Sequence, residues 1–220
     1  EALVRWLHEQ KGWISPGQFI PALEKGGYIS QLDRYMIEKV TGCLNQRRTE
    51  EKRFVPVSVN LSWMDFYDEN MLEWIVRGLK KNNQNEQKIR FEITETSLAA
   101  IGENHTRMLT HLKENGAEIL LDDFGSGYSS FGMLQDYDFD ILKMDISFVR
   151  NIGVNKKSES ILRAIIDMAH QLEIRLVAEG AETEEQVAFL RENGCDYIQG
   201  YYYYKPMPEK EFLQLLDEGK

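Results

Sequence analysis

Two adjacent aspartates, Asp122 and Asp123, stand at the end of an apolar run and precede the glycine- and serine-rich stretch FGSGYSS. This pattern predicts a strand that opens into a loop. Consecutive strand residues point to opposite sides, but at a frayed strand end both carboxylates can swing towards one point and bind hard cations. The simpler interpretation is a polar turn in which one aspartate caps the next helix. Taken alone, the segment favours that simpler interpretation.

Polar residues also end the other predicted strands. They are Asn60, Glu92, Lys143 with Asp145, Glu179 and Gln199. In a parallel barrel the carboxyl ends of all strands converge on one face, where such enzymes keep their chemistry. The set therefore favours a functional site over a series of unrelated solvent-facing turns.

Predicted strands and helices alternate along most of the chain. Strands are expected at 54–60, 89–94, 117–122, 141–145, 174–179 and 197–200, each followed by a helix, at 71–81, 103–115, 129–134, 158–172, 183–193 and 208–216. A helix at 29–48 and two short helices, starting at Pro16 and at Pro21, come earlier. This alternation predicts an α/β fold with a parallel sheet closed into a TIM-like (β/α)8 barrel. Six strands are counted, so the missing two are expected before Glu1.

The acidic strand ends imply bound cations. Five carboxylates, from Glu1, Glu92, Asp122, Asp123 and Glu179, would repel one another on a shared face, and Asn60 adds a neutral oxygen. Oxygen ligands select Mg²⁺ or Mn²⁺ over zinc or copper. Two such ions ~4 Å apart activate a water molecule and stabilise the phosphoryl oxygens of an in-line displacement. Lys143 would add positive charge there, or else would form a salt bridge to Asp145 or another carboxylate.

The composition limits the classes of partner. The chain has 220 residues, a formal net charge of -10 and a pI near 5.0, which argues against a nucleic-acid polymer or an anionic membrane as the partner. Its two cysteines, Cys43 and Cys195, imply no disulfide framework and fit a reducing cytoplasm. No apolar run is long enough to insert into a bilayer, although an upstream segment could tether the full-length protein to a membrane. The start at Glu1 rather than at methionine indicates an excised or truncated piece.

Seven motifs together resemble the EAL domain family. They are EALVRW at Glu1–Trp6, SVNLS at Ser58–Ser62, EITE at Glu92–Glu95, DDFGSGYSS at Asp122–Ser130, LKMD at Leu142–Asp145, AEGAE at Ala178–Glu182 and QGYYYYKP at Gln199–Pro206. Members of this family are cyclic di-GMP phosphodiesterases, and the resemblance covers the whole chain in order. The departures are few: Ser126 stands where threonine is usual, Met144 for isoleucine and Ala181 for valine. None of them removes a ligand.

The resemblance implies roles for individual residues. By this resemblance, one metal ion would be bound by Glu1, Asn60, Glu92 and Asp122. A second metal ion would be bound by Asp122, Asp123 and Glu179. Glu179 also matches a proposed general base, Lys143 the catalytic lysine, and Glu95 the glutamate that holds the loop Phe124–Ser130. Arg5 matches a position that contacts substrate phosphate, and Asp145 and Gln199 match positions lining the site.

The resemblance also implies a wider picture. It predicts a single EAL domain over residues 1–220, N-terminally incomplete, with the family's antiparallel first strand upstream of Glu1, and a homodimer. The expected reaction is hydrolysis of cyclic di-GMP to linear pGpG with two Mg²⁺ or Mn²⁺ ions, inhibited by Ca²⁺, whose looser coordination does not suit an octahedral site. One alternative is a non-catalytic cyclic di-GMP receptor that signals through a dimer interface or a neighbouring domain. Another is an unrelated two-metal phosphohydrolase on the same barrel.

Overall fold

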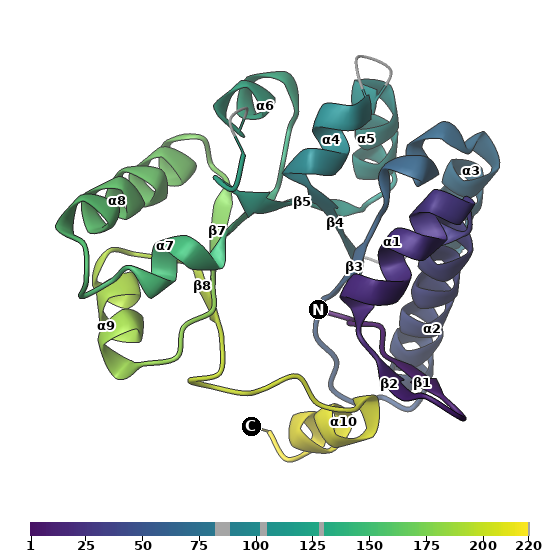
Figure 1. Cartoon of the computed structure of the whole chain (residues 1–220). Helices are drawn as coiled ribbons and strands as arrows, with labels where there is room; N and C mark the ends of the chain where they lie inside the picture. Colours follow the sequence, from purple (N-terminus) through teal and green to yellow (C-terminus); the bar gives the residue numbers. More distant parts are fainter. Residues whose placement is uncertain (82–88, 102–104, 128–129, 220) are drawn as a thin grey trace. The chain divides into compact units, whose positions relative to one another are not determined.

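The computed structural model describes residues 1–81, 89–101, 105–127 and 130–219 (Figure 1). Its contacts divide the chain into two compact units. The first comprises Glu1–Glu92, Ile101–Ala117 and Met207–Lys220, and the second comprises Ile93–Ala100 and Glu118–Pro206. Parts of three predicted segments, the helices at 103–115 and 129–134 and the loop Phe124–Ser130, lie outside the described residues. Over the described chain, no helix combines the length and hydrophobicity that crossing a membrane requires.

The predicted parallel strands are all present. They are β3 (Val57–Asn60), β4 (Ile89–Thr94), β5 (Glu118–Phe124), β6 (Ile141–Met144), β7 (Arg175–Glu179) and β8 (Tyr197–Gln199). Their order in the sheet follows the sequence, from β3 to β8. Strand β3 pairs with β4 in parallel, and so do β5 with β6, β6 with β7 and β7 with β8. The α/β class and the alternation predicted for a TIM-like barrel are therefore confirmed.

Helices of the first unit cover strand β3. The elements of this unit are β1 (Trp6–His8), β2 (Gly12–Ile14), α1 (Pro16–Gly26), α2 (Ile29–Thr49), the 3-10 helix η1 (Trp63–Tyr67), α3 (Glu69–Lys81), α5 (His105–Glu114) and α10 (Glu209–Asp217). Helix α2 packs on α1, β3 and η1, and α3 packs on η1 and α5. Ile37 and Leu44 of α2 are buried, so this helix presents the apolar face that its spacing predicted.

The second unit has a core of fully buried apolar side chains. Leu121, Ile141 and Leu176 come from neighbouring strands and are inaccessible to solvent. The covering elements are α6 (Ser130–Asp136), α7 (Ile146–Arg150), α8 (Lys156–Gln171) and α9 (Glu184–Glu192). Helices α7 and α8 pack on β7 and on each other. All four residues of strand β6 are buried, as in a parallel strand with both faces covered; three are apolar, and the fourth is Lys143.

Several elements differ from the sequence-based expectation. Pro21 does not start a second helix, because α1 runs through it to Gly26. The proline costs this helix one backbone hydrogen bond, and burial of the apolar Phe19 side chain offsets part of that cost. The β1–β2 hairpin was not predicted, since each strand has only three residues and too little alternation to detect. The helices α4 (Glu95–Ile101) and α7 were also missed, because each is too short to show a helical repeat of apolar residues.

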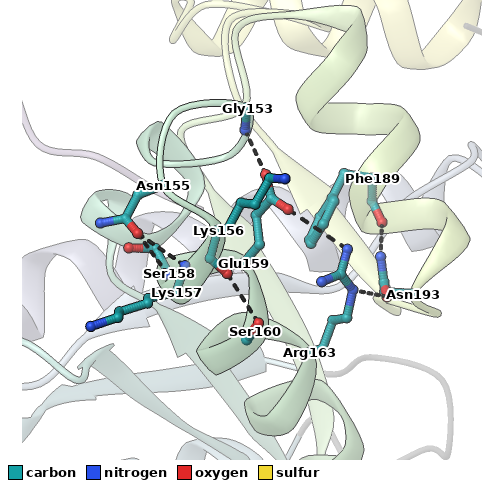
Figure 2. A network of polar contacts seen from close by, with 10 residues as sticks. All are labelled: Gly153, Asn155, Lys156, Lys157, Ser158, Glu159, Ser160, Arg163, Phe189 and Asn193. Carbon is teal, nitrogen blue, oxygen red and sulfur yellow. Dashed lines mark hydrogen bonds and ion pairs between the residues drawn. The ribbon is translucent and has the colours of Figure 1, made fainter.

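A polar network fixes the start of α8 to α9 (Figure 2). Asn155 caps α8 by accepting from the backbone N–H of Lys157, at 2.9 Å. Glu159 accepts from the N–H of Gly153 at 3.0 Å and pairs with Arg163 at 3.7 Å. The Arg163 guanidinium lies over the Phe189 ring and donates to Asn193 at 3.1 Å. These contacts stabilise the helical layer beside β7 and place no reactive group in a site, so we interpret the network as structural.

Two carboxyl groups are buried together behind the end of β3. Asp33 of α2 and Asp65 of η1 both accept from the backbone N–H of Ser62, at 3.2 and 2.9 Å. Asp65 is fully buried, and its Oδ1 has no hydrogen-bond partner among the described residues. Burial, followed by repulsion from Asp65, raises the pKa of the Asp33 carboxyl to about 9. The pair therefore keeps one proton at neutral pH.

This buried pair makes stability depend on pH. In the unfolded chain the pKa of Asp33 is near ~4. The folded protein therefore binds more protons between about pH 4 and pH 9, and its free energy of unfolding falls as the pH rises through that window. Asp33→Asn is expected to raise the free energy of unfolding at pH 8, on the order of 2–4 kcal/mol, and to change it little near pH 4. The asparagine amide can donate as the protonated carboxyl does. Urea unfolding at both pH values measures the difference.

The matched control is Glu38→Gln, which removes an acid from the exposed face of the same helix and is expected to change stability by under about 0.5 kcal/mol at either pH. An Asp33→Asn variant that is less stable than the parent protein at pH 8 would show that the pair is not a shared-proton pair.

Candidate active site

The paired aspartates lie in a β-bulge. Leu121 of β5 pairs with Leu142 of β6, but Phe124 pairs with Met144, so β5 carries one extra residue across this step. Asp123 adopts a left-handed conformation with φ of 57°, and its backbone N–H donates to Oδ1 of Asp122 at 2.9 Å. Aspartate tolerates this conformation better than most residues do. The strand therefore continues to Phe124, and a bulge rather than a frayed end presents the two carboxylates.

Lys143 of β6 joins the carboxylates of the two neighbouring strands. Its Nζ lies 3.3 Å from Oδ1 of Asp122 on β5 and 2.8 Å from Oε1 of Glu179 on β7. The side chain of Lys143 is 2% exposed, against 14% for Asp122 and 24% for Glu179. A buried ammonium requires such partners. The salt bridge foreseen for Lys143 is thus formed, and it brings together three of the predicted site residues.

Glu95 lies against the loop that follows the paired aspartates. It is the first residue of α4, is 3% exposed, and faces the backbone of Gly127. A Cβ atom on Gly127 would stand 2.6 Å from Oε1 of Glu95, so no larger residue fits there without displacing one of them. Glu95 thus lies next to the loop, and its loop-holding role stays a prediction. Residues 128–129 of the loop lie outside the described part.

Asp145 and Gln199 belong to the second unit, where Asp145 follows β6 and Gln199 ends β8, with β7 between the two strands. Asp145 is the N-cap of α7, and its Oδ1 accepts from the N–H of Ser147 at 2.9 Å. Gln199 pairs in register with Glu179, and its backbone carbonyl accepts from Ala181 at 3.1 Å. The side chain of Asp145 thus has a capping role that the sequence analysis missed. The available signal was an aspartate, a favoured N-cap residue, directly before Ile146.

The remaining predicted residues belong to the first unit. Asn60 and Glu92 are opposite one another in the β3–β4 register, and Nδ2 of Asn60 donates to Oε1 of Glu1 at 3.3 Å. The Ala2 N–H donates to the Ser58 carbonyl at 2.9 Å, which ties the start of the chain to β3. Glu92 is buried, whereas Asn60 and Glu1 are exposed.

Arg5 is exposed and forms no ion pair with another described residue of the first unit. Its guanidinium donates to the carbonyl of its chain neighbour Val4 at 2.8 Å. The predicted phosphate contact of Arg5 therefore stays a prediction.

The donor chemistry fits a hard cation. Every predicted ligand offers oxygen, and Asp122 and Glu179 already hold one cationic group, the Lys143 ammonium. In the described portion of the chain, no three or more His, Cys, Asp or Glu side chains meet in a geometry that could hold a metal ion. The ligand assignments remain predictions.

Comparison with known proteins identifies the family. The sequence model of the EAL domain matches residues 1–206. The chain is 35% identical over 217 residues to cyclic di-GMP phosphodiesterase NbdA of Pseudomonas aeruginosa, covering 97% of this chain and 28% of that protein. It is 32% identical over 216 residues to probable cyclic di-GMP phosphodiesterase PdeG of Escherichia coli, covering 98% and 43%. The chain thus spans less than half the length of either relative.

Solved structures agree. The c-di-GMP complex of PaMucR phosphodiesterase matches with a TM-score of 0.84 and 30% identity, covering 94% of this chain and 84% of that one. An EAL domain protein from Listeria monocytogenes matches with a TM-score of 0.81 and 30% identity, covering 97% and 83%. The family model, which matches residues 1–206, and relatives matched over nearly the whole chain show that this protein belongs to the EAL domain family.

Proposed function

We propose that this chain is a metal-dependent phosphodiesterase that hydrolyses cyclic di-GMP to linear pGpG. The observation that carries the proposal is the Lys143 ammonium of β6 held between Asp122 and Glu179, because it places a buried cation between carboxylates of the two flanking strands, β5 and β7. Relatives that match almost all of the chain are named cyclic di-GMP phosphodiesterases. This chain retains every predicted metal ligand, and this favours the enzyme over the non-catalytic receptor.

The proposed ligands form two overlapping sets. One Mg²⁺ or Mn²⁺ ion would be held by Glu1, Asn60, Glu92 and Asp122. The other would be held by Asp122, Asp123 and Glu179, so Asp122 is common to both sets. When bound, the two ions supply Lewis acidity that activates a water molecule and neutralises phosphoryl oxygens. In a regular strand Asp122 and Asp123 would point to opposite faces of the sheet. The bulge and the left-handed φ of Asp123 interrupt that alternation, which suits a bridging aspartate beside a second ligand.

The protein's own groups supply charge and position. Lys143 would stabilise the negative charge that develops on the phosphoryl group, since a cation in a dry site acts strongly. Glu179 would orient or deprotonate the attacking water, as a ligand or as a general base. Glu95 would hold the loop after Asp123, and Arg5, Asp145 and Gln199 would contact the dinucleotide.

The proposal extends to the setting of the protein. We propose a homodimer in a reducing cytoplasm, where Cys43 and Cys195, both free thiols here, would stay reduced. The net charge of -10 is consistent with a small anionic ligand that metal ions screen, rather than a nucleic-acid polymer.

The test of the proposal is to incubate the protein with cyclic di-GMP and to identify the products by nucleotide chromatography. We expect pGpG to appear with Mg²⁺ or Mn²⁺. With Ca²⁺ as the sole divalent ion the rate should fall by at least about 10-fold, because Ca²⁺ prefers more ligands at longer distances. Competition by other phosphodiesters checks substrate specificity.

The other outcomes separate the alternatives. Tight binding of cyclic di-GMP without turnover would favour the receptor, and cleavage of unrelated phosphodiesters at equal rates would favour a general two-metal phosphohydrolase. Full activity with Ca²⁺ would contradict the proposed metal site.

A further inference from the structure

The short helix α7 directly follows β6, the strand that carries Lys143. It has five residues, and three apolar side chains anchor it. Val149 is fully buried, whereas Ile146 and Phe148 are half-buried. The backbone N–H of Asp145, which caps the helix, donates to the carbonyl of Phe124 at 3.3 Å. Helix α7 is therefore attached to the end of β5 as well as to β6.

Phe148 packs against the backbone that follows the paired aspartates. A Cβ atom on Gly125 would lie 2.5 Å from Cε2 and 2.7 Å from Cζ of Phe148. Gly125 also has a φ of 89°, which favours glycine. The aromatic ring thus touches the main chain two residues after Asp123, at a distance that only glycine permits.

Ile146 makes the equivalent contact with the other side of the site. A Cβ atom on Gly180 would overlap Cγ1 and Cδ1 of Ile146, and Gly180 has a φ of 78°. Gly180 immediately follows Glu179 at the end of β7. One helix of five residues therefore presses one side chain against the chain after Asp123 and another against the chain after Glu179.

We infer that Ile146 and Phe148 are positioning residues that set the separation between the β5 and β7 carboxylates on either side of Lys143. Strands β5 and β7 are not paired with each other, because β6 lies between them. Helix α7 contacts the residues just beyond both strand ends, so it constrains them where the strand pairing stops. The inference rests on the proposed function, since it concerns the cation site of that phosphodiesterase.

The test compares the Mn²⁺ affinities of the purified protein and its variants. Electron paramagnetic resonance measures the concentration of free Mn²⁺ in each titration. Phe148→Ala and Ile146→Ala are each expected to weaken Mn²⁺ binding by about tenfold, equivalent to ~1.4 kcal/mol. Ile146→Val retains Cγ1 and should recover most of the affinity. Val149→Ala is the matched control, because it shortens a fully buried side chain of the same helix, and the atoms nearest to a Cβ on Gly125 or Gly180 come from Phe148 and Ile146 instead.

Thermal unfolding of each variant separates positioning from general packing. Val149→Ala is expected to lower the melting temperature at least as much as Phe148→Ala, yet to bind Mn²⁺ as the parent protein does. Equal Mn²⁺ affinity in Phe148→Ala, Ile146→Ala and the parent would overturn the inference, and so would an equal loss of affinity in Val149→Ala. A parent protein that neither binds Mn²⁺ nor cleaves cyclic di-GMP would instead overturn the proposed function.

Discussion

Replacing Glu179 with glutamine is expected to lower kcat/KM for cyclic di-GMP hydrolysis by about 10³-fold. The amide keeps the shape of the side chain but loses the charge that pairs with Lys143 at 2.8 Å. It is also a poor ligand for a hard cation and cannot accept a proton from water. Steady-state kinetics with Mg²⁺ measures the loss, which should fall mainly on kcat if Glu179 acts as the base.

The matched control for this change is Glu182→Gln. Glu182 belongs to the same AEGAE segment and is exposed, so its replacement is expected to leave the kinetics within about twofold of the parent. If Glu179→Gln kept more than about a tenth of the activity, neither the ligand nor the base role would stand.

Replacing Lys143 with methionine is expected to lower kcat by about 10²–10³-fold while leaving Mn²⁺ affinity equal to or higher than that of the parent. Methionine preserves the buried apolar stem but removes the ammonium that lies between Asp122 and Glu179. The two carboxylates then face each other without that counter-charge, which destabilises the fold. Saturating Mn²⁺ should therefore raise the melting temperature of Lys143→Met more than that of the parent.

Lys157→Met provides the comparison, since Lys157 is an exposed lysine of the same unit. A Lys143→Met variant with parental kcat would assign Lys143 a purely structural role. A variant with lost kcat and lost Mn²⁺ binding would mean that the lysine organises the ligands rather than the transition state.

The strands could be predicted well because their sequences are unambiguous. Strand β4 has the predicted bounds, Ile89–Thr94, since a buried alternating segment is flanked by polar residues. The extra helices could not be found in the same way. Helix α7 has only five residues, and its register depends on Phe148 and Ile146 meeting two glycines that are distant in sequence.

The site could be predicted by residue type but not by geometry. The paired aspartates and Lys143 were visible as strand-end residues, yet the bulge that directs Asp123 depends on the register between β5 and β6. The Asp33–Asp65 pair gave no signal, because nothing in the sequence WMDFY indicates that its aspartate is fully buried. Burial of a polar residue is a property of the packed chain, and local patterns do not carry it.

The bulge also bears on how such a site arises and is lost. Strand β5 would pair regularly with β6 if one residue were absent between Leu121 and Phe124, and both anchors would still face the core. Gain or loss of a single codon therefore separates a strand with one carboxylate from a strand with two, without redesign of the sheet. Among chains with this fold, the spacing between the two apolar anchors is as informative about chemistry as the identity of the residues between them.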